Sequence, residues 1–162
     1  MLKTEKISGS SISVRDLTLT IFLFAFLAIL SGGLIYVLFR PVESLFFTWA
    51  DEIGAGNILS NIRSVTLPLL SYIPKWFLFS LPSGLWAFAY ALIITHLWRD
   101  NNSIIKYFWI GSIPLLAIGY EFLQFTGILK GVFCHEDLIL SVAGISLGVL
   151  LGLTLTNKKN KK

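Results

Sequence analysis

Four stretches of this chain are apolar over about the length needed to cross a bilayer, and they constrain its fold more than any other feature. They cover residues 17–39, 76–98, 107–129 and 138–156. A spanning helix needs about 20 apolar residues, and no polar face alternates with these runs at a helical period. Only 14% of residues are charged, against roughly a quarter in soluble domains. We predict an all-α, polytopic membrane protein, with four transmembrane helices bundled in one integral membrane domain, residues 1–162.

Two of the runs carry signals about where their helices begin. The first is preceded by Arg15 and is longer than the roughly 7 to 15 apolar residues of a cleavable signal peptide, so we predict an uncleaved anchor. Pro82 lies near the start of the second run. Proline is tolerated in the first turn of a helix and disrupts its interior, so Pro82 either kinks the first turns or marks the true helix start.

The distribution of positive charge predicts the topology. One set of connections and tails holds Lys3, Lys6, Arg15, Arg99, Lys106, Lys158, Lys159, Lys161 and Lys162. The other connections hold only Arg40, Arg63, Lys75 and Lys130. Lysine and arginine are enriched on the cytoplasmic side, so both termini are predicted to be cytoplasmic. The connection 40–75 is then external, and its mixture of aromatic residues, leucines and isolated charges fits either short interfacial helices or an ordered loop capping the bundle.

Polar residues in the third run share one helical face. Ala117, Glu121, Gln124 and Ile128 follow one another at spacings of 4, 3 and 4 residues, which places them along one side of a helix. A carboxylate within a span is costly, so an intramembrane acid is a functional-site hypothesis by default. The alternative is that Glu121 and Gln124 only hydrogen-bond neighbouring helices together.

The fourth run has a matching stripe of small and polar residues: Asp137, Ser141, Gly144, Gly148 and Gly152. Glycines four residues apart allow membrane helices to approach closely, so we predict that the three glycines pack helices and that this stripe faces the polar stripe of the preceding span. Asp137 also has a simpler explanation, because an acid at a helix N-terminus caps the helix and meets its positive dipole end.

The residues of this hairpin resemble the VanZ-like family of small bacterial membrane proteins. The resemblance lies in Glu121-x-x-Gln124, then Lys130, then Asp137 with Ser141 and Gly144 after it. The family typically has arginine where Lys130 stands and asparagine where Ser141 stands, and lysine cannot make arginine's planar two-pronged contact. The resemblance covers about a fifth of the chain. It implies a bacterial cytoplasmic membrane protein, and the family's namesake is associated with resistance to a lipid-tailed glycopeptide antibiotic that binds cell-wall precursors.

These residues are consistent with two functions. In the first, Glu121, Gln124, Lys130, Asp137 and Ser141 form an outer-leaflet polar site that binds or modifies a lipid-linked or cell-envelope substrate. In the second, the protein is a non-enzymatic accessory or scaffold subunit whose polar residues hold helices together or dock a partner membrane protein. The predicted partners are the lipid bilayer and a lipid-linked substrate or a partner membrane protein. No nucleic-acid partner is predicted, because the basic residues flank apolar runs. No cofactor or metal site is predicted, because no metal-ligand spacing occurs.

No role is predicted for three further residues: His96, Cys134 and His135. Cys134 and His135 are adjacent on the predicted external turn, which would suit a membrane-embedded thiol transpeptidase. Neighbouring side chains usually point apart, however, and no arginine accompanies them in sequence. His96 lies beside Trp98 near the predicted cytoplasmic end of its span, where an interfacial position explains it. No catalytic residue is assigned.

Overall fold

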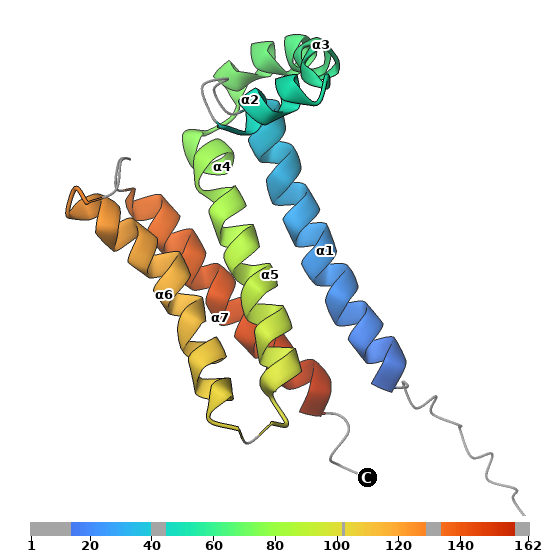
Figure 1. Cartoon of the computed structure of the whole chain (residues 1–162), viewed down its shortest axis with the longest axis vertical. Helices are drawn as coiled ribbons and strands as arrows, with labels where there is room; N and C mark the ends of the chain where they lie inside the picture. The colour runs from blue at the N-terminus through green and yellow to red at the C-terminus, as the bar shows by residue number, and fades with distance from the viewer. Residues whose placement is uncertain (1–13, 40–44, 102, 129–133, 158–162) are drawn as a thin grey trace, which may run out of the picture.

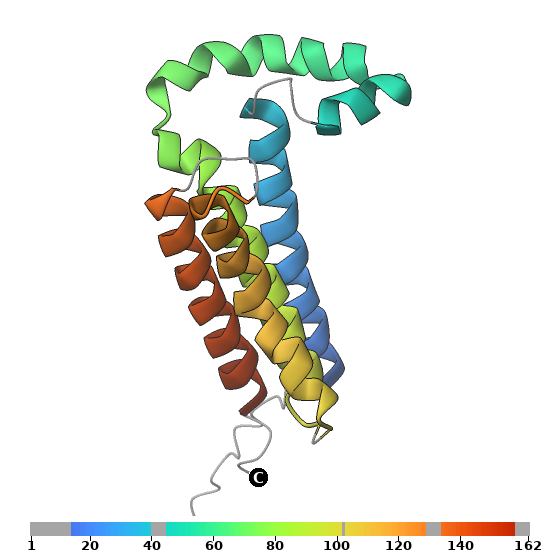
Figure 2. The same ribbon diagram turned by 60° about the vertical axis from the view of Figure 1, so that its left-hand side comes forward.

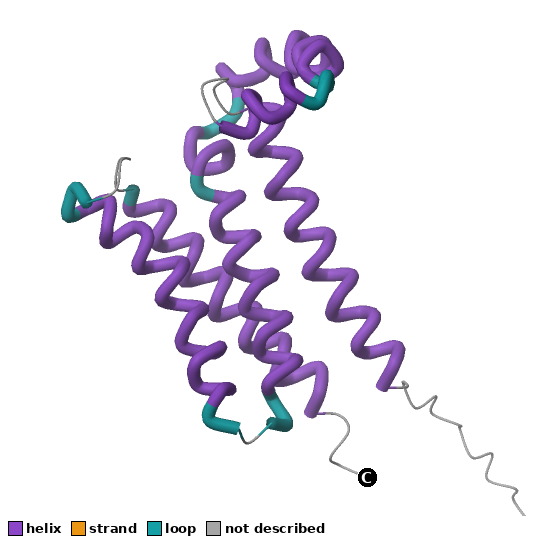
Figure 3. The backbone as a smooth tube through the Cα atoms, in the orientation of Figure 1, coloured by secondary structure: helices purple, strands orange, loops and turns teal. Residues whose placement is uncertain are grey.

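The computed structural model describes residues 14–39, 45–101, 103–128 and 134–157, and within these ranges it contains helices and no strand (Figure 3). Four of the helices are long and apolar enough to cross a membrane. The apolar windows are Arg15–Phe39, Leu81–Trp98, Ile105–Phe125 and His135–Leu155. The prediction of an all-α protein with four spans is therefore confirmed.

The long helices are α1 (Val14–Phe39), α5 (Leu81–Trp98), α6 (Ile105–Phe125) and α7 (His135–Asn157). They run up and down alternately, so that the start of α1 and the end of α7 lie at the same end of the bundle (Figure 1). Helix α5 is central: it packs most extensively against α7 and also against α1 and α6. Among the described residues, α1 and α6 do not contact each other, so both flank α5.

Four short elements join α1 to α5: α2 (Leu45–Glu52), α3 (Gly56–Thr66), the 3-10 helix η1 (Leu67–Tyr72) and α4 (Lys75–Phe79). The first three form what we call the arm, residues 45–72, which lies across one end of the bundle at a steep angle to the spans (Figure 2). The described part of the connection that was predicted to be external is thus helical, in agreement with the first of the two sequence interpretations. Among the spanning helices, the arm contacts α1 alone within the described residues.

The second predicted span is two helices instead of one. Helix α4 ends before Ser80, and α5 begins at Leu81 with Pro82 in its first turn. Proline fits there because the first N–H groups of a helix have no intrahelical partner to lose. The interpretation that Pro82 marks the true start of the spanning helix is confirmed, and the predicted start at residue 76 is wrong.

The third predicted span is too long at its C-terminal end. Helix α6 stops at Phe125 because Gly127 adopts a left-handed conformation with φ of 74°. The Gly127 N–H donates to the Gln124 carbonyl at 3.0 Å, and the Ile128 N–H donates to the Leu123 carbonyl at 3.0 Å. These two bonds form a Schellman motif, which satisfies carbonyls that the helix end would otherwise leave unpaired.

The fourth span begins three residues earlier than predicted, at His135 in place of residue 138. The Leu138 N–H donates to the Cys134 carbonyl at 3.3 Å and so closes the first turn. Asp137 therefore lies inside the first turn, and the prediction that it is the capping residue is wrong. Its carboxylate still lies near the positive end of the helix dipole.

The glycine stripe of α7 lies against α5. A Cβ added at Gly148 would be 2.5 Å from the Phe88 carbonyl oxygen, and one at Gly152 would be 3.0 Å from the Thr95 Cβ. At Gly144 the Cβ would collide with the carbonyl oxygen of Gly84. The prediction that these glycines face the third span is wrong, because α5, and not α6, occupies the groove that they leave.

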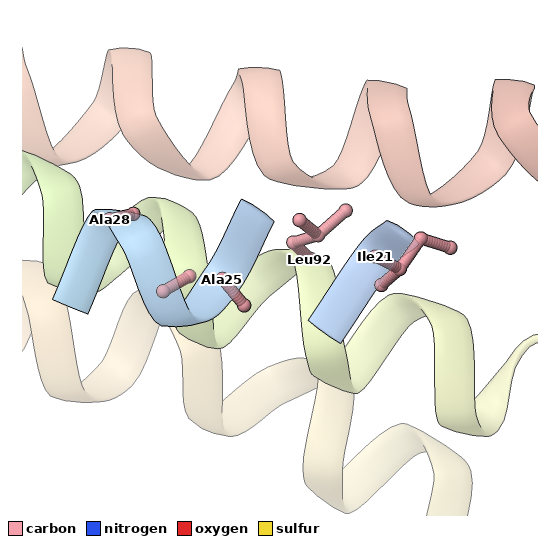
Figure 4. Packing of buried hydrophobic residues seen from close by; sticks show 5 residues of the cluster. Ile21, Ala25, Ala28 and Leu92 are labelled. Atoms are coloured by element: carbon pink, nitrogen blue, oxygen red, sulfur yellow. The ribbon is translucent and has the colours of Figure 1, made fainter. Parts of the chain in front are cut away.

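Small residues also bring α1 against α5. Ile21, Ala25 and Ala28 lie on one face of α1 and pack beside Leu92 of α5 (Figure 4). The opposite face of α1 is apolar and exposed, as at Phe26. Within a bilayer such a face contacts lipid, so these helices associate through close packing more than through water exclusion.

Arg63 fixes the arm to the end of α1. Its side chain is buried, and its Nη1 donates to the Val37 carbonyl at 2.7 Å. The guanidinium carbon lies 4.5 Å from the centre of the Phe47 ring, and the Thr66 hydroxyl donates to the Leu38 carbonyl at 3.2 Å. Burial lowers the pKa of Arg63 from its usual value. A cation on the last carbonyls of a helix also meets the negative end of its dipole.

The α3 helix of the arm is amphipathic. Ile58, Ile62 and Val65 lie on one side of a helical wheel, whereas Ser60 and Ser64 lie on the other. Thr66, whose hydroxyl donates to the Leu38 carbonyl at the end of α1, marks the side of α3 that faces α1. Ile62 lies one turn before Thr66, so the apolar side of α3 is next to the side that faces α1. This orientation suits a helix lying at the surface of a bilayer.

Replacing Arg63 by methionine is expected to loosen the arm. The Val37 carbonyl would lose its charged donor, which costs about 1–3 kcal/mol and allows roughly tenfold faster amide exchange in residues 45–72. Hydrogen–deuterium exchange measured by mass spectrometry on the purified protein checks this. The Arg63→Lys variant, which keeps the charge and loses the planar fork, should fall between the two. Equal exchange in all three proteins would contradict the anchoring role.

Candidate functional site

A cavity of about 930 Å³ opens at the arm end of the bundle. Its walls come from the end of α1, from α4, from the first half of α5, from the second half of α6 and from the start of α7. Because α1 and α6 do not contact each other, the cavity lies between two separated helices with α5 behind it.

The structure brings most of the predicted polar site into this cavity. Glu121 and Gln124 line it from α6, and Asp137 and Ser141 line it from α7. Lys130, the predicted cation of the site, lies outside the described residues. Each pair shares a helical face, as its spacing predicted, and the packing of α6 beside α7 brings both pairs to the wall of one cavity.

The two predicted stripes reach the cavity only in part. Ala117 lines it together with Glu121 and Gln124, but Ile128 lies beyond the end of α6 and is exposed. On α7 the stripe divides: its first residues, Asp137 and Ser141, line the cavity, whereas the glycines that follow pack against α5. One face of α7 thus serves both the cavity and the helix contact.

Glu121 is the most deeply placed acid of the cavity. Its side chain is only 6% exposed. The backbone N–H of Cys134 donates to its carboxylate, and Asp137 is its charged neighbour. Its Oε2 atom has no hydrogen-bond partner. Burying a carboxylate without a full set of partners is expensive, so this oxygen points to a partner that the described residues do not supply.

Two further wall residues share this property. The Asp137 Oδ1 and Ser80 Oγ atoms are also buried without a hydrogen-bond partner. Among the described residues, the only other such atom is His96 Nδ1, and its ring lies near the opposite end of α5 with Nε2 3.3 Å from the Thr18 hydroxyl. Buried polar atoms are normally paired, and here three unpaired ones gather in the wall of one cavity.

Some residues of the cavity were missed by sequence reasoning. Ser80 lies at the break between α4 and α5, and Lys75 begins α4 at the cavity's edge. The Ser-Leu-Pro order at 80–82 signalled the helix break, but nothing local showed that a bundle cavity would form beside it. Glu136 also lines the cavity, where it accepts a hydrogen bond of 2.8 Å from the Cys134 thiol.

Aromatic side chains complete the wall. Tyr36 of α1 and Trp86 of α5 both line the cavity, with ring centres 5.9 Å apart and planes tilted by 41°. The Trp86 indole N–H donates to the Ile29 carbonyl at 3.4 Å, which holds the ring against α1. Trp76, Tyr90 and Tyr120 contribute from α4, α5 and α6. The cavity therefore combines acids at its arm end with amphipathic rings along its sides.

The chemistry of this wall is that of a binding site for hydrogen-bond donors. Its described acids are Glu121, Glu136 and Asp137, and its described cation is Lys75. No group of three or more metal-ligating side chains occurs among the described residues. The Cys134 thiol donates to the Glu136 carboxylate at 2.8 Å.

Comparison of the chain with family models, with curated proteins and with solved structures finds no match. The cavity and the residues that line it are therefore the basis for a functional proposal.

Proposed function

We propose that this protein binds a lipid-linked or other cell-envelope substrate in the cavity between α1 and α6. One observation carries the proposal: the 6%-exposed Glu121, with its unpaired Oε2, shares the cavity wall with the unpaired oxygens of Asp137 and Ser80. Such acceptors are costly unless a ligand or water pairs with them. A ligand that enters from the membrane can reach a cavity between helices that do not touch.

The proposal places the cavity in the outer leaflet of the bacterial cytoplasmic membrane, with both termini in the cytoplasm. The support is the positive charge at the end opposite the arm. There Arg99 donates to the Leu153 carbonyl at 3.2 Å, and the Lys106 ammonium donates to the Arg99 carbonyl at 2.8 Å. Cationic residues at helix ends favour the cytoplasmic side, so the arm and the cavity would face the cell envelope.

Relationship to the VanZ-like family is part of the same proposal. Its support is that the two halves of the resemblance, Glu121-x-x-Gln124 and Asp137 with Ser141, line one cavity although they come from different helices. A role in resistance to a lipid-tailed glycopeptide antibiotic would fit a site open to envelope lipids. The proposed role is binding; in the same wall the Cys134 thiol donates to the Glu136 carboxylate.

Lipid retention tests the proposal. The protein is extracted from its native membrane in a mild detergent, and co-purifying lipid is counted by native mass spectrometry. Glu121→Gln and Asp137→Asn keep the side-chain size and remove the charge, and each is expected to lower retained lipid about tenfold. Glu52→Gln is the matched control, because Glu52 is exposed on the arm and does not line the cavity.

The same variants separate the proposal from the accessory-subunit alternative. If Glu121→Gln and Asp137→Asn retain lipid like the parent, the proposed site is wrong. If they also lose a partner that cross-links to the parent in native membranes, the polar residues serve helix or partner contacts instead. Melting temperatures measured alongside show whether the variants remain folded.

A further inference from the structure

We infer that the ligand of this cavity carries a primary ammonium group, as in the headgroup of an aminophospholipid. This inference rests on the proposed function and names the chemical class of the ligand. It follows from three independent properties of the described wall: its charge, the kind of hydrogen-bonding atom left unpaired in it, and the aromatic rings along its sides.

The charge of the wall is the first property. Among the described residues of the wall, Glu121, Glu136 and Asp137 are acids and Lys75 is the one cation. Glu121 and Asp137 are also neighbours, so the acceptor oxygens of two acids lie at one place in the wall. Charge interactions strengthen in surroundings of low dielectric constant, and the wall lies at the arm end of membrane-length helices. The cavity is therefore selective for positive charge over the anionic headgroups of acidic lipids.

The unpaired atoms are the second property. Glu121 Oε2 and Asp137 Oδ1 are carboxylate oxygens, which accept hydrogen bonds, and the Ser80 hydroxyl can accept as well. A primary ammonium has three N–H donors. A quaternary ammonium carries the same charge and has none, so it would leave these oxygens unpaired at a cost of about 1–3 kcal/mol each. Hydrogen bonding by the wall thus favours an ethanolamine headgroup over a choline headgroup.

The aromatic rings are the third property. Tyr36, Trp76 and Trp86 line the cavity beside the acids. The faces of such rings attract cations and are worth more when the cation is desolvated. The rings also suit the glycerol and upper acyl region of a lipid, because tyrosine and tryptophan favour the boundary between headgroups and hydrocarbon.

Lys75 supplies the complement to a zwitterionic headgroup. It is the exposed cation at the start of α4, on the edge of the same cavity. An ammonium among the acids and a phosphate beside Lys75 would match the two charges of an ethanolamine phospholipid. A divalent metal ion is the less suitable cation, because the described residues contain no group of three or more metal-ligating side chains.

The experiment compares lipids that share acyl chains and differ in headgroup. Delipidated full-length protein is titrated with phosphatidylethanolamine, phosphatidylcholine and phosphatidylglycerol, and bound lipid is measured by native mass spectrometry. Phosphatidylethanolamine is expected to bind about tenfold more tightly than the other two lipids. Glu121→Gln should remove this preference, Glu52→Gln should keep it, and Lys75→Gln should weaken binding while the preference over phosphatidylcholine remains.

The relative affinities of the parent protein for the three lipids test the inference without any variant. Equal binding of phosphatidylethanolamine and phosphatidylcholine, or preference for phosphatidylglycerol, overturns it. The parent protein could prefer phosphatidylglycerol, and Glu121→Gln could abolish that binding. In that case the cavity binds lipid as proposed, and only the inferred ammonium group of the ligand is wrong. Soluble ethanolamine is added as a competitor for bound phosphatidylethanolamine. If ethanolamine displaces the lipid when both are at the same concentration, the ligand is a free amine and the inference of a lipid ligand is overturned.

Discussion

Replacing Gly144 by leucine is expected to force α7 away from α5 and to reduce the amount of folded protein about tenfold or more. Even a single added carbon at Gly144 would collide with the carbonyl oxygen of Gly84. That oxygen belongs to helix backbone, which cannot move aside as a flexible side chain can. Because α5 packs more extensively against α7 than against any other helix, the loss of this contact removes the centre of the bundle. Fluorescence-detected size-exclusion chromatography with a melting series measures the effect.

Other glycines provide a graded series and matched controls. Gly148→Ala should be milder but destabilising, because its Cβ would lie 2.5 Å from the Phe88 carbonyl oxygen. Gly33 and Gly111 are also helical, but a Cβ added to either meets nothing within 4 Å. Gly33→Ala and Gly111→Ala should therefore melt like the parent or slightly higher, since alanine favours helix over glycine. If Gly144→Leu melts with these controls, the tight α5–α7 contact is wrong.

The second large effect is expected when the cavity is filled without any change to its charges. Ala117 lines the cavity from α6, one turn from Glu121. A tryptophan at this position would occupy space that a ligand needs, so Ala117→Trp is expected to lower retained lipid about tenfold or more. Folding should suffer little, because the added ring enters open space in place of packed backbone. Native mass spectrometry and melting are measured on the same preparation.

The control for this variant lies two residues away. Leu115 is 70% exposed on α6 and does not line the cavity, so Leu115→Trp adds the same ring on the lipid-facing side. It should retain lipid like the parent. This pair separates a binding cavity from polar contacts that only hold helices together, because neither variant alters Glu121 or Asp137. Equal retention in Ala117→Trp and Leu115→Trp would contradict a ligand within the cavity.

The spans were predictable because a bilayer requires long apolar segments, and the chain contains four of them. Their ends were less predictable, because hydropathy does not report backbone conformation. At Gly127 a left-handed residue ends α6 while apolar residues continue beyond it. At Ser80 the apolar run continues through a break between two helices. Proline at position 82 revealed the second boundary, whereas the first depended on two backbone hydrogen bonds.

The candidate site was also predictable only in part. Periodicity placed Glu121 with Gln124, and Asp137 with Ser141, because residues three or four apart share a helical face. Periodicity identifies a face but not its neighbour. The glycines of α7 were therefore assigned to the wrong helix, and Ser80 and Tyr36 were missed, since they reach the cavity from elements far away in the chain.

The sequence by itself determined an all-α membrane protein, its four apolar spans and the presence of acids on two of them, because length, composition and helical spacing are local properties. The tertiary structure alone decided that α5 lies at the centre, that Arg63 joins the arm to α1, and that α1 and α6 stay apart beside a cavity. These features depend on which helices can approach closely. That choice is made by the fit of small residues and backbone between helices, which hydropathy does not encode.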